Sequence, residues 1–216
     1  MTVPIPTPIY RITHVDNLQD NILPRDSIYA PNFAPHDGRK YTAIHYQHIQ
    51  SRRSRIGILC GPGGTILDYV PFYFAPRSPM LYVINKGGVK EYLQGQGQII
   101  YLVASAQSVA KMNQPFVFTD GHAAISGLSH FFDDLIHLDK IDWPLMKSKY
   151  WFDTDQDMDR KRRRQAEFLV YRSFPWTLVD FVAVINGRMK KQVETILAEF
   201  PEKMRRVVRI KQSWYY

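Results

Sequence analysis

The sequence predicts a mixed α+β fold with β-strands dominating the core. Several short runs rich in β-branched and aromatic residues are separated by proline, glycine and polar segments. Residues 189–200 instead have apolar positions at helical spacing, with Val193, Ile196 and Leu197 on one face. With 45% apolar and 13% aromatic residues, a chain of 216 residues can bury a sizeable core. Because nothing marks a linker, we expect one domain over residues 1–216.

The N-terminal part predicts a strand, a short helix and a loop. Residues 10–14 alternate in character, as a half-buried strand does. Residues 15–23 predict a helix that Asp16 or Asn17 can cap. Residues 24–40 are rich in proline and polar residues and predict a loop. The inward-facing residues of the helix are expected to be Leu18, Ile22 and Leu23.

The rest of the chain predicts further strands and helices. Gly61-Pro-Gly-Gly64 is expected to be a turn and not a phosphate loop, because no Gly-Lys-Ser/Thr follows it. Residues 45–53 and 130–138 are candidates for helices. The expected strands are residues 69–74, 80–84, 99–103, 115–119, 167–171, 181–185 and 207–210.

The charge of the chain favours a polyanionic partner. Lys and Arg number 28 against 20 Asp and Glu, for a net charge of +8. The basic residues form three clusters at residues 52–55, 160–164 and 205–211. Each cluster alone can be a solvated face. Interleaved with aromatic residues, the three clusters together favour nucleic acid and could line one groove.

Cysteine and histidine usage excludes some classes of site. Cys60 is the only cysteine, which excludes an intramolecular disulfide or a multi-cysteine zinc site and fits a reducing cytoplasm. His122, His130 and His137 lack zinc-site spacing, so we expect no metal requirement. The sequence has neither a signal peptide nor a run of about 18 apolar residues, so we expect a soluble cytoplasmic protein without a membrane partner.

Glu167 is the leading catalytic candidate. It follows the basic run 159–164 and opens an apolar strand, where a carboxylate can bind a ribose hydroxyl and oppose a developing positive charge. The alternative is a surface ion pair with Arg163 or Arg164, worth under roughly 1 kcal/mol. The polar stretch 119–165 before this strand predicts a substrate loop, with an irregular packed segment as the alternative.

A series of motifs in one order resembles the DarT family from about residue 9 to the last residue. These enzymes are toxins of toxin–antitoxin pairs that transfer ADP-ribose from NAD to thymidine bases of single-stranded DNA. The motifs are Ile12-Thr-His-Val-Asp-Asn17, Ile49-Gln-Ser-Arg-Arg53, Asp68-Tyr-Val-Pro-Phe-Tyr-Phe-Ala-Pro-Arg-Ser-Pro-Met80, Pro115-Phe-Val-Phe-Thr-Asp120, Ile141-Asp-Trp143 and Gln165-Ala-Glu167.

The resemblance implies an ADP-ribosyltransferase-like split, mostly antiparallel β core with helices and a long substrate-recognition loop at about residues 120–167. It implies an NAD-binding element at about residues 36–54, with the adjacent helix and the loop of the thirties closing over NAD. It also implies a thymidine-specific, sequence-dependent reaction that blocks replication and is reversed by a DarG-type macrodomain antitoxin. The residues expected to hold NAD are His14, Val15, Asp16 and Asn17.

The resemblance further implies a catalytic arginine beside Glu167. Counting forward from Ile49 favours Arg52, and counting back from Gly63-Gly-Thr65 favours Arg53, so both stay candidates for catalysis and for NAD binding. An arginine is a poor base, so its expected role is to stabilise a deprotonated thymine or to contact NAD phosphate. Alternation along the strand 69–74 offers Tyr73 as a cofactor contact, although a core role fits the pattern better.

The expected DNA contacts are Arg77, Arg163 and Arg164. Arg77 lies between two prolines and could instead brace a turn, and His14 could be a satisfied core histidine. Two rival functions stay open: a transferase that modifies RNA or protein, and a non-enzymatic binder of single strands. We expect a monomer, because a basic surface repels its own copy.

Overall fold

The computed structural model describes residues 2–44, 47–125 and 127–216. Its strands are β1 Pro8–His14, β2 Ser27–Tyr29, β3 Tyr69–Tyr73, β4 Ile99–Ser105, β5 Phe116–His122, β6 Phe131–Phe132, β7 Ala166–Tyr171, β8 Ser173–Pro175, β9 Phe181–Val184 and β10 Val207–Ile210. Within these residues, eight strands form one sheet in the order β10-β9-β4-β1-β3-β7-β5-β6, and β2 pairs with β8 beside it. Only the β9–β10 pair of the described strands is parallel.

Short helices connect the strands, and one longer helix covers an end of the sheet. The α-helices are α1 Val15–Asn17, α2 Gln47–Arg53, α3 Pro79–Asn85, α4 Ala106–Lys111, α5 Trp143–Lys147, α6 Arg160–Arg163 and α7 Gly187–Ala198. The other helical turns are η1 Leu18–Ile22, η2 Leu23–Arg25, η3 Pro31–Phe33, η4 Ile66–Asp68, η5 Gln96–Gln98, η6 Leu135–Lys140, η7 Trp176–Leu178, η8 Glu202–Met204 and η9 Gln212–Trp214. No helix in the described part of the chain is long and apolar enough to cross a membrane.

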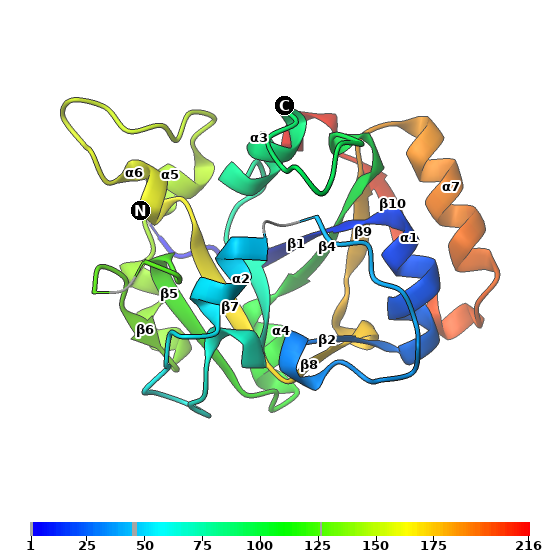
Figure 1. Ribbon diagram of the computed structural model, residues 1–216, viewed down its shortest axis with the longest axis horizontal. Helices are drawn as coiled ribbons and strands as arrows, with labels where there is room; N and C mark the ends of the chain where they lie inside the picture. Colours follow the sequence, from blue (N-terminus) through cyan, green and yellow to red (C-terminus); the bar gives the residue numbers. More distant parts are fainter. Residues whose placement is uncertain (1, 45–46, 126) are drawn as a thin grey trace.

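The sheet divides between β1 and β3. These neighbours pair at one position, Tyr10 opposite Tyr73, whereas β1 pairs with β4 from Pro8 to His14. Beyond that position the two strands diverge, so β10-β9-β4-β1 and β3-β7-β5-β6 form two halves (Figure 1). The expectation of an α+β fold with a split, mostly antiparallel β core is confirmed.

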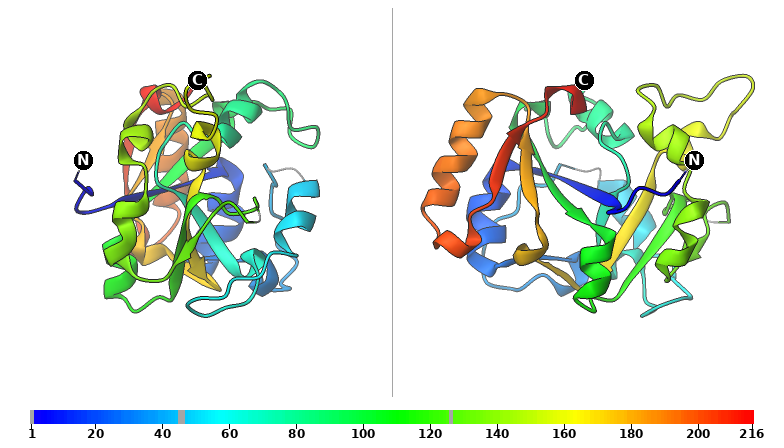
Figure 2. Two further views of the ribbon diagram at one scale, coloured as in Figure 1. Left: turned by 90° about the vertical axis from the view of Figure 1, so that its left-hand side faces the viewer. Right: turned by 180° about the vertical axis from the view of Figure 1, so that it is seen from behind.

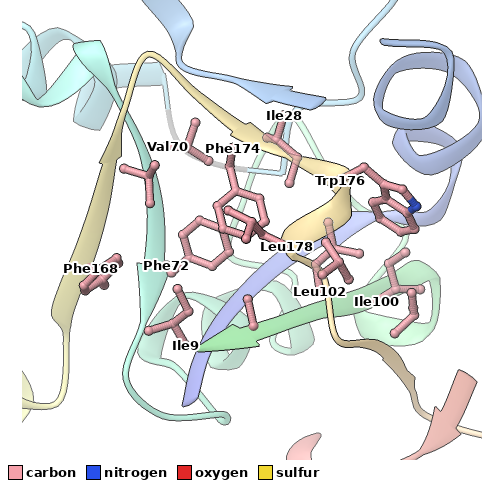
Figure 3. Packing of buried hydrophobic residues seen from close by; sticks show 14 of the residues in the cluster. Ile9, Ile28, Val70, Phe72, Ile100, Leu102, Phe168, Phe174, Trp176 and Leu178 are labelled. Carbon is pink, nitrogen blue, oxygen red and sulfur yellow. The ribbon is translucent and has the colours of Figure 1, made fainter. Parts of the chain in front are cut away.

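The main core lies on one face of the sheet, where the alternate residues of neighbouring strands meet. Phe72 packs on Phe174 with ring centroids 4.6 Å apart, and Ile9, Ile100 and Leu102 belong to the same buried cluster (Figure 3). All of these side chains are buried, and each contributes about 1.5–3 kcal/mol through removal from water. α7 lies along β10 and turns its predicted apolar face, Val193, Ile196 and Leu197, into this core (Figures 1 and 2).

The opposite face is covered by α3 and the C-terminal residues. Tyr101, Leu81 and Tyr215 are buried there, and Tyr10 and Tyr73 pack against them from the two halves of the sheet. α2 lies over the centre of the sheet, and the N-terminal segment lies on the other side (Figure 2). The divide between β1 and β3 therefore has a closed core on one side and a basic helix on the other.

Two secondary-structure predictions were wrong in kind. The predicted strand 80–84 is the helix α3, because Ser78 accepts a hydrogen bond from the N–H of Leu81 at 3.2 Å and Pro79 occupies the first turn. The predicted helix 130–138 is instead the two-residue strand β6 followed by η6, which Asp134 caps through the N–H of Ile136.

The helix and loop after β1 also differ from expectation. The helix 15–23 consists of α1, the π-turn η1 and part of η2, although its three predicted apolar residues are buried. His14, and not Asp16 or Asn17, caps it by accepting the N–H of Asp16 at Nδ1. The predicted loop 24–40 contains the strand β2 and the turn η3.

The remaining elements agree with the sequence. The predicted strands 10–14, 69–74, 99–103, 115–119, 167–171, 181–185 and 207–210 are confirmed to within a few residues at their ends. The turn at residues 61–64 is confirmed, with Gly61, Gly63 and Gly64 at positive φ. The helix predicted over residues 45–53 is α2, and its first two predicted positions lie outside the described residues.

Candidate active site

The centre of the site is an ion pair between α2 and β7. The guanidinium of Arg53 donates from Nη1 to Oε1 of Glu167 at 3.1 Å and from Nη2 to Oε2 at 2.8 Å. Glu167 is 3% exposed and Arg53 is 9% exposed, so the two charges meet out of water. A bidentate contact of this kind fixes the plane of the carboxylate as well as its position.

β5 holds Glu167 from the other side. The backbone N–H of Glu167 donates to Oγ1 of Thr119 at 3.1 Å, and the N–H of Ala123 donates to Oε1 of Glu167 at 3.3 Å. The β5–β7 register shifts between Phe118 and His122, so the chain bulges next to the carboxylate. This bulge brings the backbone N–H of Ala123 to the carboxylate of Glu167.

Both partners of the pair are charged. Burial raises the pKa of Glu167, but the charge and hydrogen bonds of Arg53 outweigh burial and leave it below its usual value. Burial likewise lowers the pKa of Arg53, and Glu167 reverses the shift, so that the net pKa is raised. Arg53 therefore stays protonated at neutral pH.

Tyr73 stands directly opposite Glu167 in the β3–β7 register and opposite Tyr10 in the β1–β3 register. Burial, with a further contribution from the charge of Glu167, raises the pKa of the Tyr73 phenol. Tyr73 is therefore a neutral aromatic wall of the site at the point where the sheet divides.

His122 is a site residue that sequence reasoning missed, since it was weighed only as a metal ligand. It ends β5 opposite Ala166, one residue before Glu167. Burial lowers its pKa, and the opposing charge of Glu167 does not cancel that effect. Nδ1 of His122 accepts the N–H of Ala124 at 3.0 Å, so the neutral ring carries its proton on Nε2.

The residues predicted to hold NAD lie at the end of β1. His14 is 2% exposed, with Nδ1 accepting the N–H of Asp16 and Nε2 2.9 Å from Oε1 of Gln94. Since Nδ1 is an acceptor, Nε2 is the nitrogen that donates to Gln94. The ring of Tyr92 packs edge-on against His14, and its buried hydroxyl has no hydrogen-bond partner in the described part of the chain. That hydroxyl is a free polar group suited to a bound polar molecule.

Two asparagines of the helical segment after β1 make hydrogen bonds to the loop that precedes α2. Nδ2 of Asn17 donates to the carbonyl of Thr42 at 2.9 Å, and Oδ1 accepts its N–H at 2.8 Å. One turn later, Asn21 donates to the carbonyl of Lys40 at 2.7 Å. Asn17 is thus engaged by the protein and positions the loop. Val15 is fully buried in the core, whereas Asp16 is exposed beside His14.

Of the two arginines that the sequence left open, Arg53 reaches Glu167 and Arg52 lies exposed on α2. The alternative considered for Glu167, a surface ion pair with Arg163 or Arg164, is wrong, because Glu167 is buried and pairs with Arg53. Arg163 instead pairs with Asp142, Asp157 and Asp159.

Arg77 and Arg164 are engaged by carbonyl groups. Arg164 is 2% exposed and donates to the carbonyls of Leu145, Met146, Ser148 and Pro76. Arg77 has a positive φ of 54°, donates to the carbonyl of Tyr215 and lies 4.1 Å from the ring centre of Tyr216. Both therefore brace the connection after β3.

The three basic clusters do not line one groove. α2 and α6 flank the site, but the third cluster follows β9 at the opposite edge of the sheet. There Arg206 donates to the carbonyl of Val179 at 2.7 Å, and Arg209 lies 4.3 Å from the ring centre of Phe181. That part of the sequence interpretation was wrong.

Among the described residues, no three His, Cys, Asp or Glu side chains are grouped to hold a metal ion. Independence from metal stays a prediction, tested by assaying activity in excess chelator. Cys60 is a free, half-buried thiol whose pKa is raised by burial and by nearby Asp133.

Known proteins match the whole chain. A family model described as DarT, ssDNA thymidine ADP-ribosyltransferase, matches residues 10–216. A DNA ADP-ribosyl transferase of Thermus sp. (strain 2.9) is 47% identical over 215 residues, covering 100% of this chain and 99% of that protein. A solved structure of Thermus sp. 2.9 DarT in complex with ADP-ribosylated ssDNA matches with a TM-score of 0.91 at 46% identity, covering 100% and 99% of the two chains. Another, in complex with NAD+, matches with a TM-score of 0.87 at 44% identity, covering 100% of each chain.

Proposed function

This chain belongs to the DarT family and is an NAD-dependent DNA ADP-ribosyltransferase, and on that premise we propose that Glu167 and Arg53 are its catalytic pair. The observation that carries the proposal is the buried bidentate contact between their side chains where the sheet divides. The acceptor is thymine in single-stranded DNA, as the family description and the DNA bound to the Thermus protein support.

NAD supplies the ADP-ribose: its bond from ribose to nicotinamide breaks, nicotinamide takes the electron pair, and N3 of thymine bonds to the same carbon. Glu167 accepts a hydrogen bond from a ribose hydroxyl and opposes the positive charge that grows on the sugar. It can do both because its pKa lies below the usual value, so it is ionised at neutral pH. Its carboxylate retains lone pairs beyond those that Arg53 uses.

Arg53 acts by charge and not as a base. Its raised pKa keeps the guanidinium protonated. In the proposed reaction it holds Glu167 in plane and stabilises the negative charge that appears on thymine as the N3 proton leaves to water. His122, neutral and protonated on Nε2, is a donor suited to a carbonyl oxygen of thymine, and Tyr73 walls the site opposite Glu167.

NAD is proposed to lie along the divide from Glu167 toward His14. Support comes from the unpartnered hydroxyl of Tyr92 beside His14, and from the NAD+ complex of the Thermus protein. Asp16 offers an exposed carboxylate there, and Asn17 positions the element at about residues 36–54. Val15, expected to hold NAD, is buried in the core and anchors this segment instead. Arg52 is proposed to contact NAD only as a surface charge.

DNA is proposed to approach along the loop at about residues 120–167, which carries α6 and projects from the sheet (Figure 1). Arg163 holds this loop through its aspartate partners, and Arg164 connects its base to the carbonyl of Pro76 after β3. Arg77, the next residue after Pro76, donates to the carbonyl of Tyr215. The further proposals from the family are a single domain over residues 1–216, a monomer, a sequence-dependent reaction, a block to replication and reversal by a macrodomain antitoxin.

The testing experiment incubates the protein with NAD and thymine-containing single-stranded oligonucleotides and reads intact mass. Thymine-free oligonucleotides and Glu167→Ala are the controls. We expect one ADP-ribose on thymine-containing strands alone and none with the variant. Competition by RNA and protein in the same tube tests the acceptor, and label on those polymers instead of DNA would overturn it.

A further inference from the structure

A cavity of about 640 Å³ lies where β3 leads into the connection toward α3, and Pro4 and Pro8 of the N-terminal segment belong to its lining. Tyr10, Trp143 and Trp214 give it aromatic walls, and Arg77, Arg164 and Lys149 are among its cationic lining residues. The volume falls within the range of small-molecule sites, about 300–1,000 Å³. None of the residues assigned above to catalysis or NAD binding lines this cavity.

The cavity carries positive charge without a compensating acid. Within the described residues, no aspartate or glutamate lines it. Arg164 is 2% exposed and donates only to carbonyl oxygens, so its charge has no carboxylate partner. Nε of Arg164 and Nε of Arg77 are both buried without a hydrogen-bond partner in the part of the chain described. Burial lowers the pKa of Arg164 to about 10, which still leaves it charged at neutral pH.

The walls offer flat apolar surface. Tyr10 and Trp214 meet edge to face, with ring centroids 5.2 Å apart and planes at 87°, and both are half-buried. The indole N–H of Trp143 is satisfied by the carbonyl of Leu138 at 2.8 Å, so that side chain contributes ring surface to the wall. An anion with a flat ring, such as a nucleotide, satisfies both the uncompensated charge and the aromatic walls.

The position ties the cavity to the reaction. Tyr10 is the cross-strand partner of Tyr73, which itself stands opposite Glu167. Directly opposed residues lie about 5 Å apart in a sheet, so the aromatic wall begins two strands from the catalytic carboxylate. Arg164 reaches the cavity from the segment that leads into Glu167.

We propose that this cavity binds a nucleotide of the DNA strand next to the modified thymine, with its base against Tyr10 and Trp214 and its phosphate near Arg77 and Lys149. The inference rests on the proposed function, because it takes the strand to be the substrate. It supplies a physical origin for a sequence preference: the cavity accepts one neighbouring base and not the thymine itself.

The test introduces a bulky side chain at the edge of the cavity. Ser213 is exposed and lines the cavity, whereas Gln212 is its exposed neighbour and does not. Ser213→Trp is therefore compared with Gln212→Trp, which has the same bulk on the same turn. Substrates are oligonucleotides with one thymine and an abasic site at each flanking position in turn, and the readout is kcat/KM for transfer.

For the wild type and Gln212→Trp we expect one flanking abasic site to lower kcat/KM by about tenfold, the scale of one lost base stack. Ser213→Trp should already have a kcat/KM about tenfold lower on the intact strand, because its indole fills the cavity. The abasic site should then lower its kcat/KM no further. Equal rates for all three proteins on every strand would overturn the proposal.

A binding measurement separates this proposal from the proposed function. Fluorescence anisotropy with the same strands, without NAD, should show weaker binding by Ser213→Trp than by Gln212→Trp even if no transfer occurs. A wild type that binds with this pattern but does not label DNA would overturn the function and keep the cavity. A free deoxynucleoside monophosphate that competes as well as the strand would show a site for free nucleotide and would overturn the assignment to DNA.

Discussion

Arg53 and Glu167 are 114 residues apart in sequence, yet two parallel hydrogen bonds of 3.1 and 2.8 Å join their side chains in the interior. The pair fixes α2 against β7 across the divided sheet. Removal of one charge leaves the other buried and unpaired, which is costlier than removal of both.

The free energy of unfolding should fall more when one charge of the pair is removed than when both are removed. We expect Arg53→Met to lower the free energy of unfolding by about 3–5 kcal/mol, because the carboxylate of Glu167 stays buried without its partner. The double variant Arg53→Met, Glu167→Leu should recover most of that loss. Urea unfolding of both single variants and the double variant measures the coupling. Additive losses would mean that the pair does not interact energetically.

Activity should separate the two neighbouring arginines. Arg53→Lys keeps the charge but cannot make the planar two-point contact, so transfer to DNA should fall by about 100-fold or more. The matched change Arg52→Lys alters an exposed side chain and should leave the rate within about twofold. Single-turnover labelling of a thymine oligonucleotide measures both, and an equal loss in Arg52→Lys would reverse the assignment.

The pH dependence of stability should report His122. Burial places its folded pKa below the unfolded value of about 6.5. As pH falls through that value, the unfolded chain takes up a proton that the folded protein resists, so the wild type loses stability toward acid. His122→Gln lacks this loss.

Urea midpoints from pH 8 to pH 5 for the two proteins should therefore converge as pH falls. Glu167, whose folded pKa is also depressed, adds a further loss only below about pH 4.3, outside this window. A constant difference between wild type and variant would show that His122 is not perturbed.

The sequence predicted most of the sheet because residues 168–171 of β7 and 99–104 of β4 are continuous apolar runs, whose burial can be predicted without knowing their partners. It failed at α3, where apolar residues 80–84 match a strand and only the Ser78-Pro79 start distinguishes a helix. Contacts between residues far apart in the sequence could not be predicted from it. The choice of Arg53 over Arg52 depends on the rotation of α2 relative to Glu167, which a count along the chain does not contain.

His122 shows the same limit in the site. In sequence it is a histidine without special spacing that follows the predicted strand 115–119, and its proximity to Glu167 arises from the irregular β5–β7 register. The resemblance implied that Asn17 holds NAD, but the structure engages its amide with Thr13 and Thr42. A family resemblance names a position, whereas the hydrogen bonds show whether its side chain is free to touch a ligand.

The hold of Asn17 and Asn21 on the loop before α2 leads to a last prediction. Asn17→Ala removes the paired hydrogen bonds to Thr42, and Asn21→Ala removes the bond to Lys40. If this loop closes over NAD, its loosening lowers the fraction of protein ready to bind. KM for NAD should rise by about five- to tenfold, while kcat changes by less than about twofold.

Gln19→Ala on the same helical segment is the matched control, because Gln19 is exposed and bonds to Glu199 instead of the loop. Its KM for NAD should equal that of the wild type. KM is measured at saturating oligonucleotide, and thermal unfolding checks that all three variants are folded. An equal fall in kcat and kcat/KM for Asn17→Ala would show that the loop contributes to the chemical step and not to NAD binding.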